Sequence, residues 1–309
     1  GQEGYRLRVG DWRGRKVSVC VGDDCVRVTL IDWCACPGDR IIDLYGDAVH
    51  AVEYEREHSR TLAQHNQWLD LLRQKLCEEC GVLLDDVFLK PKHRQRGLTQ
   101  FEKFGDRNVT RIVQEGGLKF EVNLSDYIDT GLFLDHRLTR AMVAKHAKGK
   151  RVLNLFCYTG SFTVYAGAAG AAATTSVDLS NTYLDWCERN LRLNGLWDGP
   201  HDLVRSDVMA YLQAHSRAES DLYDMMIVDE AHQLGWKQGE PSPEYQIIDD
   251  LGKNIPGLLL LTATPEQLGP QGHFARLRLL DPQRFVSLEQ FFEDAKNYHH
   301  VADQVKKLM

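Results

Sequence analysis

Two positions in the middle of the chain combine residue types that can hold a nucleotide-like ligand. Tyr158-Thr-Gly160 interrupts an apolar run, and Asp178 ends a second run eighteen residues after Gly160. A tight glycine turn at a helix N-terminus presents backbone N–H groups, and a carboxylate after the next strand can accept from ribose hydroxyls. A second acid, Asp207, follows a third short run. The spacing therefore predicts a site for an adenosine-like ligand.

The glycine content of the turn narrows the choice of ligand. The turn holds one glycine and lacks the G-x-G-x-x-G pattern of dinucleotide sites. A looser loop suffices when no pyrophosphate has to approach the backbone, so S-adenosylmethionine fits better than NAD. The same residues also fit an ordinary βαβ unit with a structural turn, and this alternative stays open on these residues alone.

The elements that must position these residues alternate along the second half of the chain. Strands are predicted at 152–156, 174–178, 202–206 and 221–229, and helices at 161–170, 181–193 and 208–215. Regular alternation predicts the α/β class, with a Rossmann-like, doubly wound parallel sheet. Such sheets bind ligands at the carboxyl ends of their strands, which is where Gly160, Asp178 and Asp207 would lie.

The N-terminal part has a different pattern. Residues 5–54 alternate in the manner of strands separated by turn signals, and a helix is predicted at 59–80. This predicts a small antiparallel β region with one helix. The chain has eight cysteines, whose spacings match neither a common zinc knuckle nor a disulfide framework. No metal site is predicted, and a reducing compartment, the cytoplasm, is favoured.

The bulk composition is that of an ordinary globular protein. The 309 residues are 43% hydrophobic and 26% charged, with a net charge of −7. No apolar run approaches the roughly 20 residues needed to cross a membrane, so no membrane contact is predicted. The first residues have no signal-peptide character and no starting Met, which indicates a fragment. Nothing in the sequence determines the oligomeric state.

One basic segment stands out from the acidic chain. Between Lys90 and Arg111, seven Lys and Arg residues stand against two acids. A local basic segment suits the binding of a phosphate backbone, although a solvated basic hairpin remains an alternative. The residues predicted to contact RNA are Lys90, Lys92, Arg94, Arg96, Lys103 and Arg107.

The segment from Asp126 to Arg137 is unusual for a simple linker. It combines three acids, a glycine, aromatic residues and the triplet Asp135-His-Arg137 within twelve residues. Loop residues of these types often bind ligands. The alternative is that Asp135 caps the helix predicted after it.

Residues of about 40–228 resemble the class I methyltransferases of bacterial large-subunit rRNA, above all the guanine-N7-methylating half of the bifunctional enzyme. The motifs that carry the resemblance are Leu89-Lys-Pro-Lys-His-Arg-Gln-Arg-Gly97, Asn123-Leu-Ser-Asp-Tyr-Ile-Asp-Thr-Gly-Leu-Phe-Leu-Asp-His-Arg137, Asn154-Leu-Phe-Cys-Tyr-Thr-Gly-Ser161, Val177-Asp-Leu-Ser180 and Glu188-Arg-Asn-Leu-Arg-Leu-Asn-Gly195. The resemblance implies S-adenosylmethionine as cofactor and ribosomal RNA as partner. It implies that Asp178 binds the ribose, that Asp207 lies near the adenine, and that further cofactor contacts come from Phe133, Asp135, Arg137, Phe156, Tyr158, Thr159 and Gly160.

The family pattern stops at the fourth strand. It should end in Asp-Pro-Pro-x-Phe, the loop that frames the target base, but here Asp229 leads into Glu230-Ala-His-Gln-Leu234. Asp229 takes the place of the family's Asp beside the methyl donor and is the candidate catalytic residue. Because the loop that positions the base is replaced, cofactor binding is expected with more certainty than turnover.

Residues of about 229–309 resemble a second family, the RNA-polymerase-recycling Swi/Snf ATPase of bacteria. The resemblance rests on Val228-Asp-Glu-Ala-His-Gln-Leu234, Leu258-Leu-Leu-Leu-Thr-Ala-Thr-Pro-Glu-Gln-Leu268 and His273-Phe-Ala-Arg-Leu-Arg-Leu-Leu-Asp-Pro282. In that family the first of these is a Mg²⁺- and water-binding box. It needs a G-x-x-x-x-G-K-[ST] phosphate loop, which the sequence lacks, so we do not expect ATP hydrolysis.

Three regions and one main function are predicted from these observations. Residues 1–125 form an RNA-binding, β-rich region with one helix, 126–228 a methyltransferase core, and 229–309 a helicase-like α/β segment that continues the sheet. The main hypothesis is an S-adenosylmethionine-dependent rRNA methyltransferase acting on guanine N7. The alternatives are an RNA-binding module with a vestigial cofactor pocket, which would not bind the cofactor, and a fragment of a Swi/Snf-type ATPase.

Overall fold

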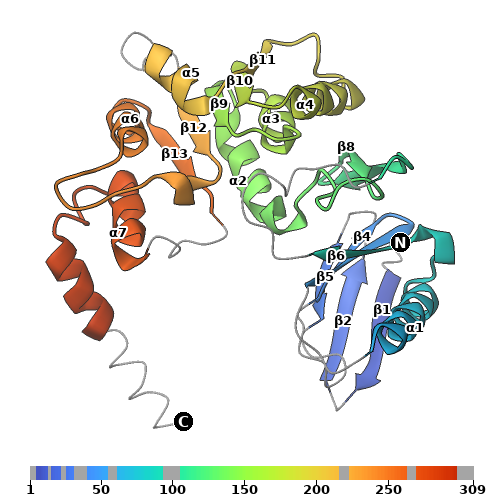
Figure 1. Ribbon diagram of the computed structural model, residues 1–309. Helices are drawn as coiled ribbons and strands as arrows, with labels where there is room; N and C mark the ends of the chain where they lie inside the picture. Colours follow the sequence, from blue (N-terminus) through green and yellow to red (C-terminus); the bar gives the residue numbers. More distant parts are fainter. Residues whose placement is uncertain are drawn as a thin grey trace. The chain divides into compact units, whose positions relative to one another are not determined.

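A computed structural model describes residues 5–12, 15–21, 26–30, 40–54, 61–92, 105–215, 223–262 and 269–297 (Figure 1). The chain divides into two compact units. The first comprises residues 1–143 and 189–196, and the second comprises residues 144–188 and 197–309. Two helices, α2 (Arg137–Ala147) and α4 (Asn181–Leu193), have residues in both units.

The second unit is built on a five-stranded sheet in the order β11-β10-β9-β12-β13, in which every pairing is parallel. The strands are β9 (Arg151–Leu155), β10 (Ala173–Asp178), β11 (His201–Arg205), β12 (Met225–Val228) and β13 (Gly257–Leu260). The strand order reverses at β9, which pairs with β10 on one side and β12 on the other. This is the doubly wound, Rossmann-like α/β fold that the sequence predicts, and its switch point is where such sheets bind ligands.

Helices connect the strands of this sheet (Figure 1). They are α3 (Ser161–Ala168), α4, α5 (Val208–His215) and α6 (Pro243–Gly252), while α7 (Gly269–Leu280) and a further helix at 288–297 follow the last strand. Strand β12 is buried along its whole length, as expected of a central parallel strand covered on both faces. One apolar core joins the sheet to the last three labelled helices, through residues such as Leu155, Val228, Leu212, Ile248 and Leu279.

The first unit holds a mixed four-stranded sheet in the order β3-β4-β5-β6 and a separate antiparallel pair, β1 (Tyr5–Trp12) and β2 (Arg15–Val21). Strands β3 (Val26–Leu30), β4 (Arg40–Tyr45) and β5 (Ala48–Tyr54) pair antiparallel, as predicted. Strand β6 (Val87–Lys92) instead pairs parallel to β5, because a helix crosses over between them.

That crossover helix, α1 (Leu62–Cys80), begins at a capping box. The Thr61 hydroxyl accepts the N–H of Gln64, whose side chain accepts the N–H of Thr61 in return. Leu72 and Leu76 pack on the apolar face of β4 to β6, and the short 3₁₀ turn η1 (Leu84–Asp86) leads into β6. Among the residues that the structure describes, no helix is both long and apolar enough to cross a membrane.

Strands β7 (Thr110–Glu115) and β8 (Leu118–Asn123) form a hairpin closed by Gly116 and Gly117. Both glycines have positive φ, 59° and 78°, as the twist of a two-residue hairpin requires. Two asparagines, one in the last turn of α4 and one directly after it, occupy the outer edge of β8: Asn190 accepts the N–H of Glu121 at 2.9 Å, and Asn194 accepts the N–H of Lys119 at 2.9 Å. Side chains four residues apart on a helix share a face, so this pair stands in for a neighbouring strand.

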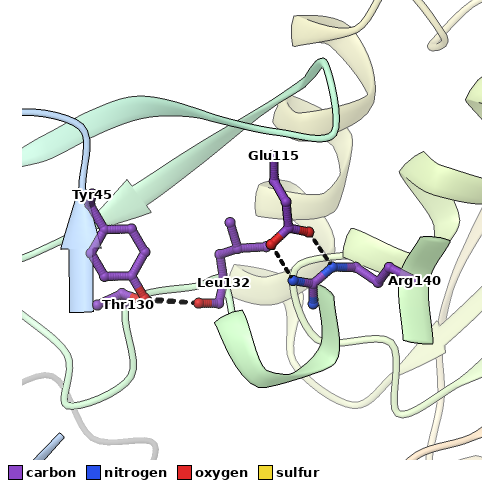
Figure 2. A network of polar contacts seen from close by, with 5 residues as sticks. All are labelled: Tyr45, Glu115, Thr130, Leu132 and Arg140. Atoms are coloured by element: carbon purple, nitrogen blue, oxygen red, sulfur yellow. Dashed lines mark hydrogen bonds and ion pairs between the residues drawn. The ribbon is translucent and has the colours of Figure 1, made fainter. Parts of the chain in front are cut away.

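An ion pair inside the first unit joins the hairpin to α2. Arg140 donates from Nε and Nη2 to the two carboxylate oxygens of Glu115, each at 2.7 Å (Figure 2). The side chain of Arg140 is 1% exposed and that of Glu115 is 0% exposed. Close by in the same view, the Tyr45 hydroxyl lies 2.7 Å from Thr130 Oγ1 and donates to the Leu132 carbonyl at 2.9 Å. The loop before α2 is thereby tied to β4, and α2 to β7.

Removing one partner of the buried ion pair should destabilise the first unit strongly. Glu115→Met leaves Arg140 charged and without its carboxylate, and we expect the free energy of unfolding to fall by about 3–5 kcal/mol. The double variant Glu115→Met/Arg140→Met should cost clearly less, because it buries no unpaired charge. Urea unfolding of the three proteins measures both values; equal losses in the single and double variants would contradict the expectation.

Candidate functional site

The chain passes from β9 into α3 through a five-residue loop with an unusual backbone. Phe156, Tyr158 and Gly160 all have positive φ, at 56°, 52° and 72°. Gly160 forms the N-cap of α3, and a Cβ atom added there would lie only 2.0 Å from the Cys187 sulfur. A side chain at this position is therefore excluded by close contact with α4 as well as disfavoured by its φ.

Hydrogen bonds hold this loop against β10. The N–H of Cys157 donates to the Val177 carbonyl at 3.1 Å, and the N–H of Gly160 donates to the Cys157 carbonyl at 2.9 Å. The N–H of Tyr158 donates to a carboxylate oxygen of Asp178 at 2.9 Å. The first turn of α3, whose N–H groups have no partner within the helix, follows directly after this fixed loop.

Asp178 lies at the carboxyl end of β10 with both oxygens oriented by the backbone. One oxygen accepts from Tyr158 and the other accepts the N–H of Ser180 at 2.9 Å. Partial burial raises the pKa of Asp178, while hydrogen bonds from Ser180, Tyr158 and Leu179 oppose that rise. A carboxylate has about four acceptor positions and three are used by backbone N–H groups, so one remains for a ligand such as a ribose hydroxyl.

Two further acids follow β11 and β12 of the same sheet. Asp207 is exposed after β11, and its side chain accepts the N–H of Ala210 at 2.9 Å, which caps α5. Asp229 follows β12, where its N–H reaches the Leu155 carbonyl at 3.4 Å. The structure thus brings Phe156, Tyr158, Thr159, Gly160, Asp178, Asp207 and Asp229 together at one edge of the sheet, as the sequence predicts. The capping role of Asp207 was not predicted.

The turn after Asp229 has a backbone that proline could not adopt. Glu230 has φ of 52° and caps the 3₁₀ turn η5 (Ala231–Gln233), and its carboxylate lies 2.9 Å from His232 Nδ1. The N–H of Ala231 donates to the Leu261 carbonyl at 2.8 Å. Proline fixes φ near −65° and has no N–H, so an Asp-Pro-Pro sequence would not fit this turn as it stands.

A buried polar network behind the loop was not anticipated from the sequence. Asn154 donates to Thr163 Oγ1 at 2.9 Å, and Thr163 lies 2.7 Å from Ser176 Oγ. All three side chains are buried, and they join β9, α3 and β10. The sequence feature that could have indicated this network is Asn154, which lies in an otherwise apolar run, because a buried amide requires hydrogen-bond partners. The network fixes α3 on the sheet and so fixes the loop that precedes it.

Three predicted cofactor residues belong to the first unit. Phe133 precedes the 3₁₀ turn η3 (Leu134–His136) and is 37% exposed, Asp135 lies in that turn, and Arg137 begins α2. The N-cap of η3 is Phe133, and the alternative that Asp135 caps α2 stays a prediction. The role of these three residues in cofactor binding stays a prediction.

The predicted RNA-binding residues are described in part. The ammonium of Lys90 is half-buried and donates to the Tyr127 carbonyl, and burial lowers the pKa of Lys90 to about 8 against the opposing effect of Asp126 and Asp129. Arg107 is exposed. Arg94, Arg96 and Lys103 lie outside the described residues, as does the side chain of Lys92. Their contact with RNA stays a prediction.

Cys77 and Cys80 form a C-x-x-C pair at the end of α1, a spacing that also occurs in redox and metal sites. Cys77 and Cys80 are free and half-buried, and burial raises the pKa of Cys80 to about 11. A raised pKa reduces the thiolate that such chemistry needs. Within the described ranges, no group of three or more His, Cys, Asp or Glu residues is placed to hold a metal ion. The four cysteines between Cys20 and Cys36 lie where side chains are not described.

A family model described as S-adenosylmethionine-dependent methyltransferase matches residues 85–247. The chain belongs to this family. The matched residues include the β9–α3 loop, Asp178, Asp207 and Asp229, and they extend past the point at which the methyltransferase pattern was predicted to stop. S-adenosylmethionine is the cofactor of the family.

Curated relatives of this methyltransferase have names that refer to ribosomal RNA. It is 46% identical over 187 residues to "Ribosomal RNA large subunit methyltransferase K" of Neisseria meningitidis, an alignment that covers 60% of this chain and 52% of the relative. It is 45% identical over 188 residues to "Ribosomal RNA large subunit methyltransferase K/L" of Hahella chejuensis, covering 61% of this chain and 26% of the relative. The methyltransferase thus spans about half the length of the first relative and about a quarter of the second.

Solved structures show the same fold. A SAM-dependent methyltransferase from Streptococcus mutans superposes with a TM-score of 0.58 at 24% identity, covering 78% of this chain and 61% of that one. A methyltransferase complexed with SAH (S-adenosylhomocysteine) gives a TM-score of 0.55 at 25% identity, covering 76% and 62%. Both likenesses extend over most of the methyltransferase chain.

Replacing Asp178 should weaken cofactor binding. Asp178→Ala removes the acceptor of the ribose hydroxyls, so we expect S-adenosylmethionine affinity to fall by roughly 10- to 100-fold, or about 1.5–3 kcal/mol. The matched control is Asp202→Ala, which removes an exposed carboxylate from β11 of the same sheet. Calorimetric titration measures both, and unchanged affinity in a folded Asp178→Ala protein would exclude the site.

The lowered pKa of Lys90 predicts a pH dependence of stability. The unfolded chain keeps its lysine protonated up to about 10.5, whereas the folded protein releases the proton from Lys90 near pH 8. The unfolded state therefore binds more protons between these values, and the Lys90 contribution to stability rises with pH in that window. Urea unfolding at pH 7.5 and 9.5 should show this rise to be lost in Lys90→Met and kept in Lys145→Met, which removes an exposed lysine of α2.

Proposed function

We propose that the chain binds S-adenosylmethionine at the carboxyl ends of β9 to β12 and directs methyl transfer to large-subunit ribosomal RNA. The observation that carries the proposal is the joint arrangement of Asp178 and the β9–α3 loop, in which one carboxylate orients the backbone and still has an acceptor position for a ribose hydroxyl. The RNA class is supported by the names of relatives that are 45–46% identical.

Each residue at this edge has a definable task. Asp178 accepts from the ribose hydroxyls, and Gly160 lets the ligand approach the backbone at the start of α3, where N–H groups favour electron-rich atoms. Asp207, on the next strand, lies on the side of Asp178 away from β9 and suits contact with the adenine. When bound, S-adenosylmethionine supplies an electrophilic methyl group on a sulfonium.

The acceptor atom that we propose is guanine N7. This nitrogen carries a lone pair and no proton, so the transfer requires no general base. The task of the protein is then to place the base in line with the methyl group and to exclude water. Asp229 lies beside the β9–α3 loop and is positioned to orient the base through a hydrogen bond, which is the catalytic role we assign to it.

The replaced loop after Asp229 leads us to expect slow turnover. In the resembled family two prolines stiffen this loop. Here Glu230 adopts a left-handed conformation, and the N–H of Ala231 donates to the carbonyl of Leu261, directly after β13. A loop set at a different angle no longer holds the base in one orientation. Cofactor binding depends on β9 and β10 and should persist.

We also propose that residues 229–309, which resemble the Swi/Snf-like family and of which 229–247 also match the methyltransferase family model, serve this chain by completing its sheet. In support, β13 pairs in parallel with β12, and α6 and α7 pack into the same apolar core. In the resembled ATPase family, the acids at the positions of Asp229 and Glu230 act on a triphosphate that a lysine-bearing loop holds. The loop that follows β9 here is Phe156-Cys-Tyr-Thr-Gly160 and contains no lysine.

Three measurements test the proposed function. Calorimetric titration with S-adenosylmethionine should show binding. Incubation with Mg·ATP, followed by an assay for free phosphate, should show no phosphate release. Incubation of a large-subunit rRNA fragment with methyl-labelled cofactor should give 7-methylguanosine, detected by nucleoside mass spectrometry, at a rate well below that of a family member with Asp-Pro-Pro. The Asp229→Ala variant tests the role of this residue, and it should reduce the methylation rate more than the affinity for S-adenosylmethionine.

Other outcomes would reject particular parts of the proposal. No cofactor binding would leave an RNA-binding module, and methylation at another atom would remove the guanine N7 assignment. Phosphate release from ATP that Glu230→Gln abolishes would favour the ATPase.

A further inference from the structure

Two aromatic side chains of α4 pack against the ring of Tyr158. The ring centroids of Tyr158 and Tyr183 lie 4.5 Å apart with an interplanar angle of 70°, which is the edge-to-face geometry that aromatic pairs favour. Trp186, one turn further along α4, has its ring centroid 6.5 Å from that of Tyr158. Tyr183 is 9% exposed and Trp186 is 2% exposed. The ring of Tyr158 is therefore held on a buried face of α4.

The same helix is joined to Asp178 through Ser180. Ser180 lies directly before α4, its N–H donates to one oxygen of Asp178 at 2.9 Å, and its Oγ accepts the N–H of Tyr183 at 3.4 Å. The other oxygen of Asp178 accepts the N–H of Tyr158 at 2.9 Å. Hydrogen bonds and the ring pair thus close a circuit of four residues, all of them in the second unit: Tyr158, Asp178, Ser180 and Tyr183.

The backbone of Tyr158 depends on contacts of this kind. Its φ of 52° lies in the left-handed region, which is unfavourable for a residue that has a Cβ atom. The bond to Asp178 holds the N–H of Tyr158, whereas Tyr183 holds its side chain. When the ring contact is lost, the backbone relaxes toward a negative φ and the N–H of Tyr158 turns away from Asp178.

We propose that Tyr183 is a positioning residue of the cofactor site, which acts through Tyr158 and makes no contact with the ligand. Its ring fixes Tyr158, whose N–H in turn orients the carboxylate of Asp178 toward a ribose hydroxyl. A ligand that meets a loop held in advance loses less conformational entropy on binding. The inference rests on the proposed binding of S-adenosylmethionine and adds a residue that lies on a helix rather than at the end of a strand.

Replacing Tyr183 separates its ring from its hydroxyl. Tyr183→Leu removes the ring, and we expect the affinity for S-adenosylmethionine to fall roughly three- to tenfold, the equilibrium factor that corresponds to one aromatic pair. Tyr183→Phe keeps the ring and should bind as tightly as the wild type. Calorimetric titration measures all three proteins. No loss in a folded Tyr183→Leu protein, or an equal loss in Tyr183→Phe, would overturn the proposal.

Tyr211 provides the matched control for general destabilisation. It is a tyrosine of α5 in the same unit, it is 7% exposed, and its hydroxyl lies 2.9 Å from that of Tyr223. Tyr211→Leu should lower the midpoint of urea unfolding and leave the affinity of the folded protein for S-adenosylmethionine unchanged. A loss of affinity equal to that in Tyr183→Leu would reject a specific role for Tyr183.

A double variant tests whether Tyr183 acts through Tyr158. The affinity loss in Tyr158→Leu/Tyr183→Leu should be no larger than the loss in Tyr158→Leu, because Tyr183 then has no ring to hold. Losses that multiply would contradict the proposal. If Tyr183→Leu does not fold, Tyr158→Leu removes the other ring of the pair from a partly buried position, and unchanged affinity in that variant overturns the proposal.

Amide hydrogen exchange of the free protein tests the circuit without a ligand. The amide of Tyr158, which donates to Asp178, should exchange faster in Tyr183→Leu and at the wild-type rate in Tyr183→Phe. Unchanged exchange in Tyr183→Leu rejects the circuit even when S-adenosylmethionine binds. A wild-type chain that binds no S-adenosylmethionine rejects the proposed function instead, and the exchange rates then decide the circuit by themselves.

Discussion

The route of the backbone from β9 into α3 is the constraint on which the proposed cofactor site depends. Two non-glycine residues and one glycine take positive φ within five residues. Left-handed conformations cost an L-residue about 1–2 kcal/mol each, so the surroundings must hold them. Asp178 does so from β10 by accepting the N–H of Tyr158, and the close approach of Cys187 on α4 admits only glycine at 160. The carboxylate that orients the loop is also the one best placed to bind a ribose.

Buried polar groups supply the precision of both units. In the second unit, Asn154, Thr163 and Ser176 satisfy one another and fix α3 on β9 and β10. In the first unit, Glu115 and Arg140 form a paired contact with almost no exposure. A buried polar group is costly when it lacks a partner, so each of these networks is compatible with few arrangements of the elements it joins.

The end of β12 shows how a strand can be kept while its loop changes. The parallel strand needs only buried apolar residues and a place beside β9, which Met225–Val228 provides. The loop needs a defined backbone, and Glu230 and Ala231 give it one that excludes proline. In the proposed function, cofactor binding and base positioning therefore rest on separate parts of this chain, and the second can alter while the first remains.

The sequence by itself determined the fold class, the order of strands and helices in the second unit, and the edge at which Gly160, Asp178, Asp207 and Asp229 meet. It could do so because alternation of apolar strands and helices, with acids after the strands, admits few topologies. Only the tertiary structure decided that β6 runs parallel to β5, that Lys90 reaches the Tyr127 carbonyl, and that Cys187 closes the space beside Gly160. Such contacts join residues far apart in sequence and depend on positions in space, which neither periodicity nor residue type specifies.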